Sequence, residues 1–463
     1  MARIGGQVIP RNTLLLVASE GFIVFISLAI AAAVSLAQTG TVWQYLFDSG
    51  TLWRFGVVVV ICELSFYYND LYDLQAVRST LLFSIQLLQA LGVALIFLGV
   101  SYYINEQLSP GRGIAVLAAP TILVLLMAWR YYVGTVVSRV QPKERVLIAG
   151  TGAVGQQLAH ELENRPEFNY EVVGCLLENH RGVGELNIPV VGNIQEIEQV
   201  AAEQKVDRIV LSLAEKRGGM PVRELLHLKF KGITIEDPHS FYERISGRVV
   251  LDGILPSWFI LSEGFRQPRF TLFLKRISDI LIALLGLVLA LPIIALVAIA
   301  IIIEDGAPVL FRQKRIGLDG RPFEILKFRS MRTAPPDAKP SWTGDGDPRV
   351  TRVGKLIRTF RFDELPQFIN VLRGDMSLVG PRPEVPYFTQ MLEEKIPFFG
   401  QRHAVRPGIT GWAQIKYHYG ASVEDARRKL ELDLFYIKHL SFVLDLAIIF
   451  ETAKVVVFGR GAK

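Results

Sequence analysis

Two adjacent carboxylates, Asp363 and Glu364, stand just ahead of a helix-like stretch in the segment FDELPQ at residues 362–367. Pro366 fits only the first turn of a helix, so the carboxylates lie at the positive end of a helix dipole, which favours anions. The pair permits a division of labour, in which one carboxylate attacks phosphorus while the other helps to hold Mg²⁺. Simple capping of the helix by Asp363 is the alternative, and for such a residue taken alone it is the commoner role.

Basic residues surround this pair in the sequence. Arg358 and Arg361 precede it, Arg382 follows between two prolines, and two more charged segments come earlier: KFRSM at 327–331, with Lys327 and Arg329, and DGDPR at 345–349. An arginine between prolines has less entropy to lose on binding, and its fork grips phosphate oxygens. Phosphoryl transfer requires mainly positioning and charge neutralisation, often with a metal. Any one arginine is more typical of a surface or a salt bridge, but the whole set favours a phosphoryl-transfer site.

The composition indicates a membrane protein with globular parts. Of the 463 residues 51% are hydrophobic, and the formal net charge of +6 suits a protein beside anionic lipid or phosphate-rich substrates. Two cysteines, Cys62 and Cys175, are too few and too far apart for a disulfide framework. The seven histidines lack paired spacing, so we expect no zinc site. The basic charge belongs to membrane flanks and to the phosphate site, which makes nucleic acid a poor candidate partner.

Four apolar stretches fill the first third of the chain, at residues 14–36, 52–68, 81–103 and 114–137. Each is near the ~20 residues that a helix needs to cross the hydrocarbon core. Arg3, Arg11, Arg78, Arg139, Lys143 and Arg145 would all fall on one side, so the positive-inside rule puts both ends of a four-helix transmembrane bundle (residues 1–140) in the cytoplasm. Glu63, inside the second stretch, marks either a ligand pathway or a polar contact between helices.

A Rossmann-like α/β domain is expected over residues 141–265. A strand-like run at 145–149 leads into GTGAVG at 150–155 and a helical pattern, and further strand-like runs follow at 172–177 and 208–213. Gly150, Gly152 and Gly155 in this context raise the hypothesis of a bound nucleotide, with Glu178 near the distance expected for a ribose contact. The alternative is that the glycines serve only a tight turn and close helix packing.

A fifth apolar run, at residues 280–303, has Pro292 near its middle and basic residues on both flanks. A spanning segment should have its basic residues mainly on one side. We therefore expect a re-entrant membrane helix over about 272–304 that bends at Pro292 and returns to the same face, with a kinked spanning helix as the alternative. The run at 440–458 is typical of an amphipathic helix, lying on the membrane surface or against the core.

Four motifs together resemble the bacterial sugar transferase family, the monotopic phosphoglycosyl transferases: KFRSM at 327–331, FDELPQ at 362–367, NVLRGDMSLVGPRP at 370–383 and RPGITGW at 406–412. The resemblance runs from about residue 270 to the C-terminus. It implies a mixed α/β catalytic domain that, with the re-entrant helix, forms residues 266–463. The four-span bundle and the Rossmann-like domain look like the large subgroup that initiates exopolysaccharide, O-antigen or capsule synthesis.

The resemblance also implies a mechanism and its residues. Asp363 would attack the β-phosphate of a UDP-sugar, expel UMP and pass the sugar phosphate to a polyprenyl phosphate such as undecaprenyl phosphate. Glu364 would bind Mg²⁺ together with Asp363. Arg358 and Arg382 match family positions that contact phosphate, with Lys327 and Arg329 nearby, and Pro292 matches the helix-breaking proline. One departure is Leu291, which stands where a serine often precedes that proline in small members.

The resemblance places the chain in a bacterial inner membrane as a homodimer in contact with lipid, with the catalytic domain on the cytoplasmic face. Two other functions stay open on the sequence. A membrane-bound NAD-dependent nucleotide-sugar dehydratase or epimerase would need a Tyr-x-x-x-Lys pair, and no tyrosine has a lysine four residues later. A non-enzymatic scaffold of polysaccharide assembly would bind a nucleotide or a partner subunit through the Rossmann-like unit, a role that the first 260 residues could serve even in an active enzyme.

Overall fold

The computed structural model describes residues 2–4, 7–9, 11–37, 40–69, 71–72, 80–133, 143–165, 168–178, 188–213, 220–254, 256–262, 264–265, 267–332, 349–417, 420 and 422–458. Arg78, Arg139 and the acidic residues of the 345–349 motif lie outside them. The chain divides into two compact units, mainly Val8–Pro238 and mainly His239–Lys463.

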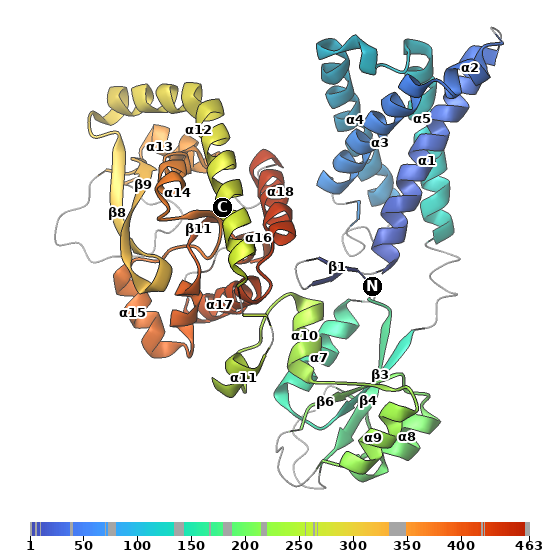
Figure 1. The fold of residues 1–463 in the computed structure, drawn as a ribbon, viewed down its shortest axis with the longest axis vertical. Coiled ribbons are helices and arrows are strands. Elements are labelled where there is room, and N and C mark those ends of the chain that lie inside the picture. Colours follow the sequence, from blue (N-terminus) through green and yellow to red (C-terminus); the bar gives the residue numbers. More distant parts are fainter. Residues whose placement is uncertain are drawn as a thin grey trace. The chain divides into compact units, whose positions relative to one another are not determined.

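The predicted apolar stretches of the first unit are helices. The elements of the chain before the sheet are β1 (Ala2–Ile4), β2 (Gln7–Ile9), α1 (Arg11–Leu36), α2 (Val42–Leu46), α3 (Ser49–Tyr68), α4 (Thr80–Ile104), η2 (Glu106–Leu108) and α5 (Arg112–Tyr132) (Figure 1). Helices α1, α3, α4 and α5 are each long and apolar enough to cross a membrane. They pack around a shared apolar core, with α1 against α3 and α5, and α3 against α4.

Charged groups inside this bundle are paired. The guanidinium of Arg130 forms an ion pair with Glu20, which is 1% exposed, and also donates to the carbonyl of Leu71 at 2.8 Å. The hydroxyl of Tyr72 donates to Glu63 at 2.5 Å. Glu63 therefore makes a polar contact between α3 and the segment that follows it, and this contact is with neither a ligand nor another helix. Such pairing is what makes ionised groups tolerable in an apolar bundle.

A five-stranded parallel sheet confirms the predicted α/β unit. Its order is β5-β4-β3-β6-β7, formed by β3 (Glu144–Ala149), β4 (Tyr170–Leu177), β5 (Val190–Asn193), β6 (Arg208–Leu211) and β7 (Thr234–Glu236), with α7 (Ala153–Asn164), η5 (Ile194–Glu196), α8 (Ile197–Glu203) and α9 (Val222–Phe230). Alternate residues of β3 face opposite sides: Leu147 packs with α8 and α9, and Ile148 with α7. The strand order reverses between β3 and β6, as in Rossmann-type sheets.

The second unit is built around a helix that is buried on every side. Its elements are α10 (Pro238–Ser246), α11 (Pro256–Leu261), α12 (Arg269–Asp305), β8 (Leu310–Ile316), η6 (Leu318–Gly320), β9 (Pro322–Phe328), α13 (Arg352–Thr359), η7 (Phe362–Glu364), α14 (Gln367–Arg373), β10 (Ser377–Val379), α15 (Pro386–Lys395), η8 (Phe399–Ala404), β11 (Gly408–Thr410), α16 (Trp412–Lys416), α17 (Val423–Lys438) and α18 (Phe442–Phe458). Eight consecutive residues of α17, from Leu430 to Ile437, are buried. Val249 and Leu251 join this core.

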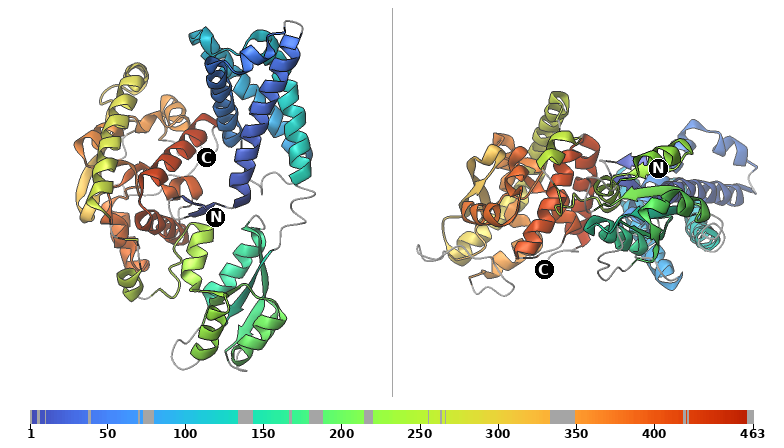
Figure 2. Two further views of the ribbon diagram at one scale, coloured as in Figure 1. Left: turned by 45° about the vertical axis from the view of Figure 1, so that its right-hand side comes forward. Right: turned by 90° about the horizontal axis from the view of Figure 1, so that it is seen from below.

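Helix α12 is continuous but turns a corner partway along, as Figure 1 shows, and Pro292 is the proline inside it. A proline inside a helix removes a backbone hydrogen bond and bends the helix. Before the bend, Lys275 forms a buried ion pair with Asp445 of α18 at 2.7 Å, and the two helices lie beside one another in the further views of Figure 2. After the bend, Val297 and Ile301 pack with Phe328 and Ile357. Both halves of α12 therefore contact the same compact unit.

Replacing Arg130 tests the polar contact in the membrane bundle. Arg130→Met leaves Glu20 buried without its cation, and removing one partner of a buried ion pair costs about 3–5 kcal/mol. We expect this variant to lose helical circular dichroism at a lower SDS concentration than the parent protein. The control is Glu20→Gln/Arg130→Met, which loses the same contact to Leu71 but buries no unpaired charge and should recover most of the loss. Equal destabilisation of the two variants would contradict the assignment.

Candidate active site

Asp363 and Glu364 lie on a one-turn 3₁₀ helix, η7, between α13 and α14. Helix α13 starts at Thr351, whose hydroxyl accepts a hydrogen bond from the amide of Gly354 at 2.8 Å. The chain then leaves α13 through Arg361, which has a left-handed backbone with φ 57°. Such a conformation is uncommon for a residue with a side chain and is retained where the surroundings hold it.

Helix capping, the simpler alternative for Asp363, is not what the structure shows. Pro366 is the N-cap residue of α14, and neither η7 nor α14 has a side-chain capping hydrogen bond. The two carboxylates precede α14 as predicted, but on a separate turn. The side chain of Asp363 thus caps neither helix, and it is half-buried.

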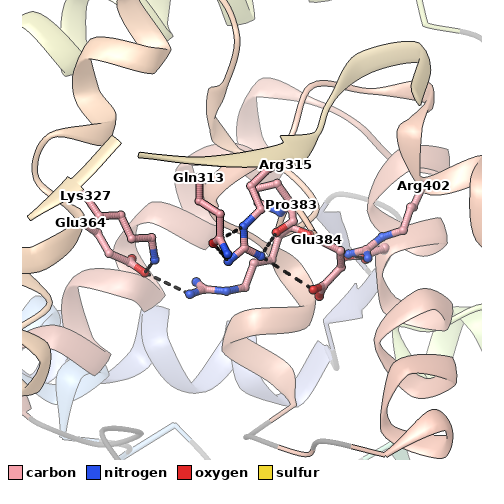
Figure 3. A network of polar contacts seen from close by, with 9 residues as sticks. Gln313, Arg315, Lys327, Glu364, Pro383, Glu384 and Arg402 are labelled. Atoms are coloured by element: carbon pink, nitrogen blue, oxygen red, sulfur yellow. Dashed lines mark hydrogen bonds and ion pairs between the residues drawn. The ribbon is translucent and has the colours of Figure 1, made fainter. Parts of the chain in front are cut away.

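Glu364 is the anion at the centre of a cluster of cations. It is 8% exposed, and its Oε1 accepts hydrogen bonds from Lys327 Nζ and from Arg382 Nη2, both at 3.1 Å (Figure 3). Burial alone would raise the pKa of Glu364, but the charges of Lys327, Arg382 and Arg361 outweigh it and hold this pKa below its usual range. Glu364 is therefore ionised and joins β9, η7 and the Pro-Arg-Pro turn.

The surroundings of Asp363 shift its pKa in the opposite direction from that of Glu364. Burial and the neighbouring charge of Glu364 raise the pKa of Asp363, and the charges of Lys327, Arg382 and Arg358 offset this only in part. A more basic carboxylate is a better nucleophile once it is ionised. The two adjacent carboxylates thus differ in role: one is held by cations and the other is left less neutralised.

Two predicted phosphate ligands lie in different places. Arg358 is exposed at the end of α13 and acts on the charge of Asp363. Arg329 is buried and donates to the carbonyl of Asp305 at 2.7 Å and to that of Gly306, at the C-terminal end of α12. Its guanidinium stabilises that helix end instead of joining the cluster around Glu364.

Three contacts that support the site could not be predicted from the sequence. Arg315 and Arg402 donate to carbonyls of the Pro-Arg-Pro turn, and Arg402 is paired with the buried Asp433 (Figure 3). The carboxylate of Glu304, near the end of α12, accepts from the amides of Arg352 and Val353 at 2.8 Å each, at the start of α13. An arginine or acidic residue within an apolar segment indicates that its side chain has a polar partner. The spacing of residues in the sequence does not identify that partner.

The glycine-rich turn after β3 is filled by a side chain of the same sheet. The amide of Gly155 donates to the hydroxyl of Ser212 at 3.0 Å, and the amide of Gly152 donates to the Ser212 carbonyl at 2.9 Å. A Cβ added to Gly155 would lie 2.5 Å from that hydroxyl, and Gly150 has φ 109°. These contacts agree with the alternative in which the glycines serve the turn and its packing.

Two family models match the chain. Residues 270–459 match the model described as bacterial sugar transferase, and residues 68–227 match the model described as CoA-binding domain. The first match contains the whole cluster around Asp363 and Glu364 together with α12.

Curated relatives match the same region and more. The UDP-N-acetylgalactosamine-undecaprenyl-phosphate N-acetylgalactosaminephosphotransferase of Aeromonas hydrophila is 45% identical over 48% of this chain and 52% of its own length. The UDP-glucose:undecaprenyl-phosphate glucose-1-phosphate transferase of Escherichia coli strain K12 is 35% identical over 67% of each. The undecaprenyl-phosphate glucose phosphotransferase of Komagataeibacter xylinus is 36% identical over 69% of this chain and 60% of its own length.

The chain thus spans 52%, 67% and 60% of the length of these three relatives. It covers two thirds of a relative that is 35% identical, and the match to the family model at residues 270–459 includes the motifs and the charged cluster described above. The chain belongs to the bacterial sugar transferase family.

Proposed function

We propose that this protein transfers a sugar-1-phosphate from a UDP-sugar to undecaprenyl phosphate, with Asp363 as nucleophile. The observation that carries the proposal is the unequal pair of carboxylates, in which Lys327 and Arg382 hold Glu364 while Asp363 is less neutralised. The relatives named above are transferases that use undecaprenyl phosphate, which supports the same acceptor here.

The chemistry proceeds in two displacements at phosphorus. A carboxylate oxygen of Asp363 bonds to the β-phosphorus of the UDP-sugar as the bond to the UMP oxygen breaks, and UMP leaves with that electron pair. A phosphate oxygen of the polyprenyl phosphate then attacks the same phosphorus and releases Asp363. Lys327, Arg358 and Arg382 supply positive charge near the transferring phosphate, which is the main demand of phosphoryl transfer.

The residues at the site fit Mg²⁺. Asp363 and Glu364 are hard oxygen donors, and Mg²⁺ is commonly bound by one or two carboxylates together with substrate phosphates and water. Among the described residues no group of three or more His, Cys, Asp and Glu forms a complete protein cage, which is consistent with a site that substrate completes. Bound Mg²⁺ would neutralise charge on the pyrophosphate.

Helix α12 would keep the active site at one membrane surface. A straight helix of its 37 residues would extend about 55 Å and reach across the bilayer. Its bend and the packing of both halves on the catalytic unit support a re-entrant element, with both ends on the side of the catalytic domain. The apolar side chains on its outer face, such as Leu285, Leu289 and Leu296, are exposed and suit lipid. The cytoplasmic face of a bacterial inner membrane is the proposed location, because UDP-sugars are cytoplasmic substrates.

Three further expectations stay predictions. They are the division of the chain into three parts at residues 140 and 265, the homodimer, and the initiation of exopolysaccharide, O-antigen or capsule synthesis. CoA or a dinucleotide is not assigned to the turn at Gly150, Gly152 and Gly155, because Ser212 already uses two of its amides. A dehydratase or epimerase would need such a cofactor, so this turn does not favour that alternative.

Replacing Asp363 tests the nucleophile. We expect Asp363→Asn to lose UMP release from UDP-sugars by at least about 10³-fold, because an amide is not a competent nucleophile. The parent protein incubated with donor alone should carry a sugar-phosphate adduct that peptide mass spectrometry maps to Asp363. Asp319→Asn is the matched control, since Asp319 has a left-handed backbone with φ 54° that asparagine also adopts. An adduct on another residue would refute the assignment.

Removing divalent cations tests the proposed metal. We expect a chelator to lower UMP release by more than about tenfold, and added Mg²⁺ to restore it, because two carboxylates and a pyrophosphate are otherwise left in mutual repulsion. The thermal unfolding midpoint should not change, because the cluster of Glu364, Lys327 and Arg382 is held without metal. Full activity in the chelator would show that the pair works without Mg²⁺.

A further inference from the structure

The turn that carries Arg382 is held by three hydrogen bonds to its backbone, and Figure 3 shows two of the residues that donate them, Arg315 and Arg402. Arg402 Nη2 donates to the carbonyl of Arg382 at 3.0 Å, and Arg315 Nη1 donates to the carbonyl of Pro383 at 3.0 Å. The amide of Ile316 donates to the carbonyl of Glu384 at 3.0 Å. Three successive carbonyls are thereby fixed from η8 and β8, and the side chain that leaves this fixed backbone reaches Glu364.

Arg402 is itself held from the core. It is 6% exposed and its Nη2 lies 2.8 Å from Asp433 Oδ2, on the buried helix α17, where Asp433 is 2% exposed. The ring of Phe399 lies 5.0 Å from the guanidinium. Burial raises the pKa of Asp433 to about 6, although the charge of Arg402 acts to lower it. A carboxylate and a guanidinium are thus kept out of water at this point.

Stability is a weak explanation for this pair. Well-packed apolar residues of similar volume often replace a buried ion pair without loss, because the ion pair must overcome the desolvation of both charges. The Nε of Arg402 is buried and has no hydrogen-bond partner, which adds a further penalty. What the pair does provide is a donor directed at the carbonyl of Arg382 from η8, held in place by Asp433 on the buried helix α17.

We infer that Arg402 is a positioning residue for the transfer reaction: anchored by Asp433, it holds the backbone of Arg382 so that the Arg382 guanidinium stands beside Glu364. The inference rests on the proposed function, because Arg382 is there taken to act on the transferring phosphate. Arg315 holds the next carbonyl and has Gln313 Oε1 at 2.7 Å, so it fixes the other side of the same turn.

The test replaces the pair by apolar residues and asks whether the loss depends on Arg382. The variant Arg402→Met/Asp433→Leu leaves no buried charge unpaired, so it should fold, with a thermal unfolding midpoint within a few degrees of the parent. We expect kcat/KM for UMP release to fall about 10- to 100-fold, with a rise in KM for the UDP-sugar. In an Arg382→Ala background the same change should reduce kcat/KM by less than about threefold, because the positioned group is already gone.

Two further variants serve as controls for the change in kcat/KM. Lys438→Met/Glu243→Gln removes another buried ion pair of the same unit, at 2.8 Å, that does not touch the turn, and it should leave kcat/KM unchanged. Arg402→Lys retains a cation, but its ammonium stands on a shorter side chain than Nη2, the one atom that reaches both Asp433 and the carbonyl of Arg382, so its activity should be intermediate. Losses that multiply with Arg382→Ala, or full activity in Arg402→Met/Asp433→Leu, would overturn the inference.

Hydrogen exchange of the amides over residues 380–384 provides a readout that needs no activity. We expect exchange there to be at least about tenfold faster in Arg402→Met/Asp433→Leu and unchanged in the Lys438→Met/Glu243→Gln control. If the parent protein releases no UMP from any donor while exchange responds as expected, the proposed function fails and the contact stands. If the parent is active but exchange and kinetics do not respond, the function stands and the positioning role fails.

Discussion

Glu364 accepts hydrogen bonds through one oxygen from two cations that come from distant parts of the chain, and this shared contact brings the site together. Lys327 ends a strand, Arg382 leaves a proline-bounded turn, and both lie 3.1 Å from the same carboxylate oxygen. Without that anion the two cations would repel one another across a half-buried space. A phosphoryl-transfer site needs such cations close together before the substrate arrives. The hydrogen bonds to Glu364 hold them together in the folded protein, so the substrate does not have to assemble them.

The same contact gives the neighbouring aspartate its character. Lys327 and Arg382 are shared, but they lie against Glu364, so Asp363 feels less of their charge and also the repulsion of Glu364. The two acids follow one another on η7, whose N-cap residue Arg361 has a left-handed backbone, and Glu364 is buried while Asp363 is half-buried. The difference between the two acids therefore lies in the cations that the side chain of Glu364 contacts.

Local pattern predicted much of this arrangement, and long-range contacts escaped it. The apolar helices, the parallel sheet and the position of Asp363 and Glu364 before α14 follow from hydropathy, strand spacing and Pro366. The place of Arg329 did not follow, because a basic residue in a motif looks the same whether it stabilises a helix end or faces a phosphate. The pairing of Arg402 with Asp433, 31 residues apart, and the filling of the glycine turn by Ser212 depend on which elements pack together.

The end of α12 is connected to this cluster through side-chain contacts with backbone groups. The end of α12 is held by Arg329, and Glu304 within that last turn accepts from the first amides of α13. Helix α13 in turn leads directly into Arg361 and η7, while residues after the bend pack on Ile357 and Phe362. A shift of the end of α12 would therefore move the turn that carries Asp363, whereas Arg382 is fixed from η8 and β8. Asp363 is thus positioned by contacts with α12 and α13, and Arg382 by contacts with η8 and β8. Glu364 links the two sets of contacts, because it follows Asp363 in the chain and accepts a hydrogen bond from Arg382.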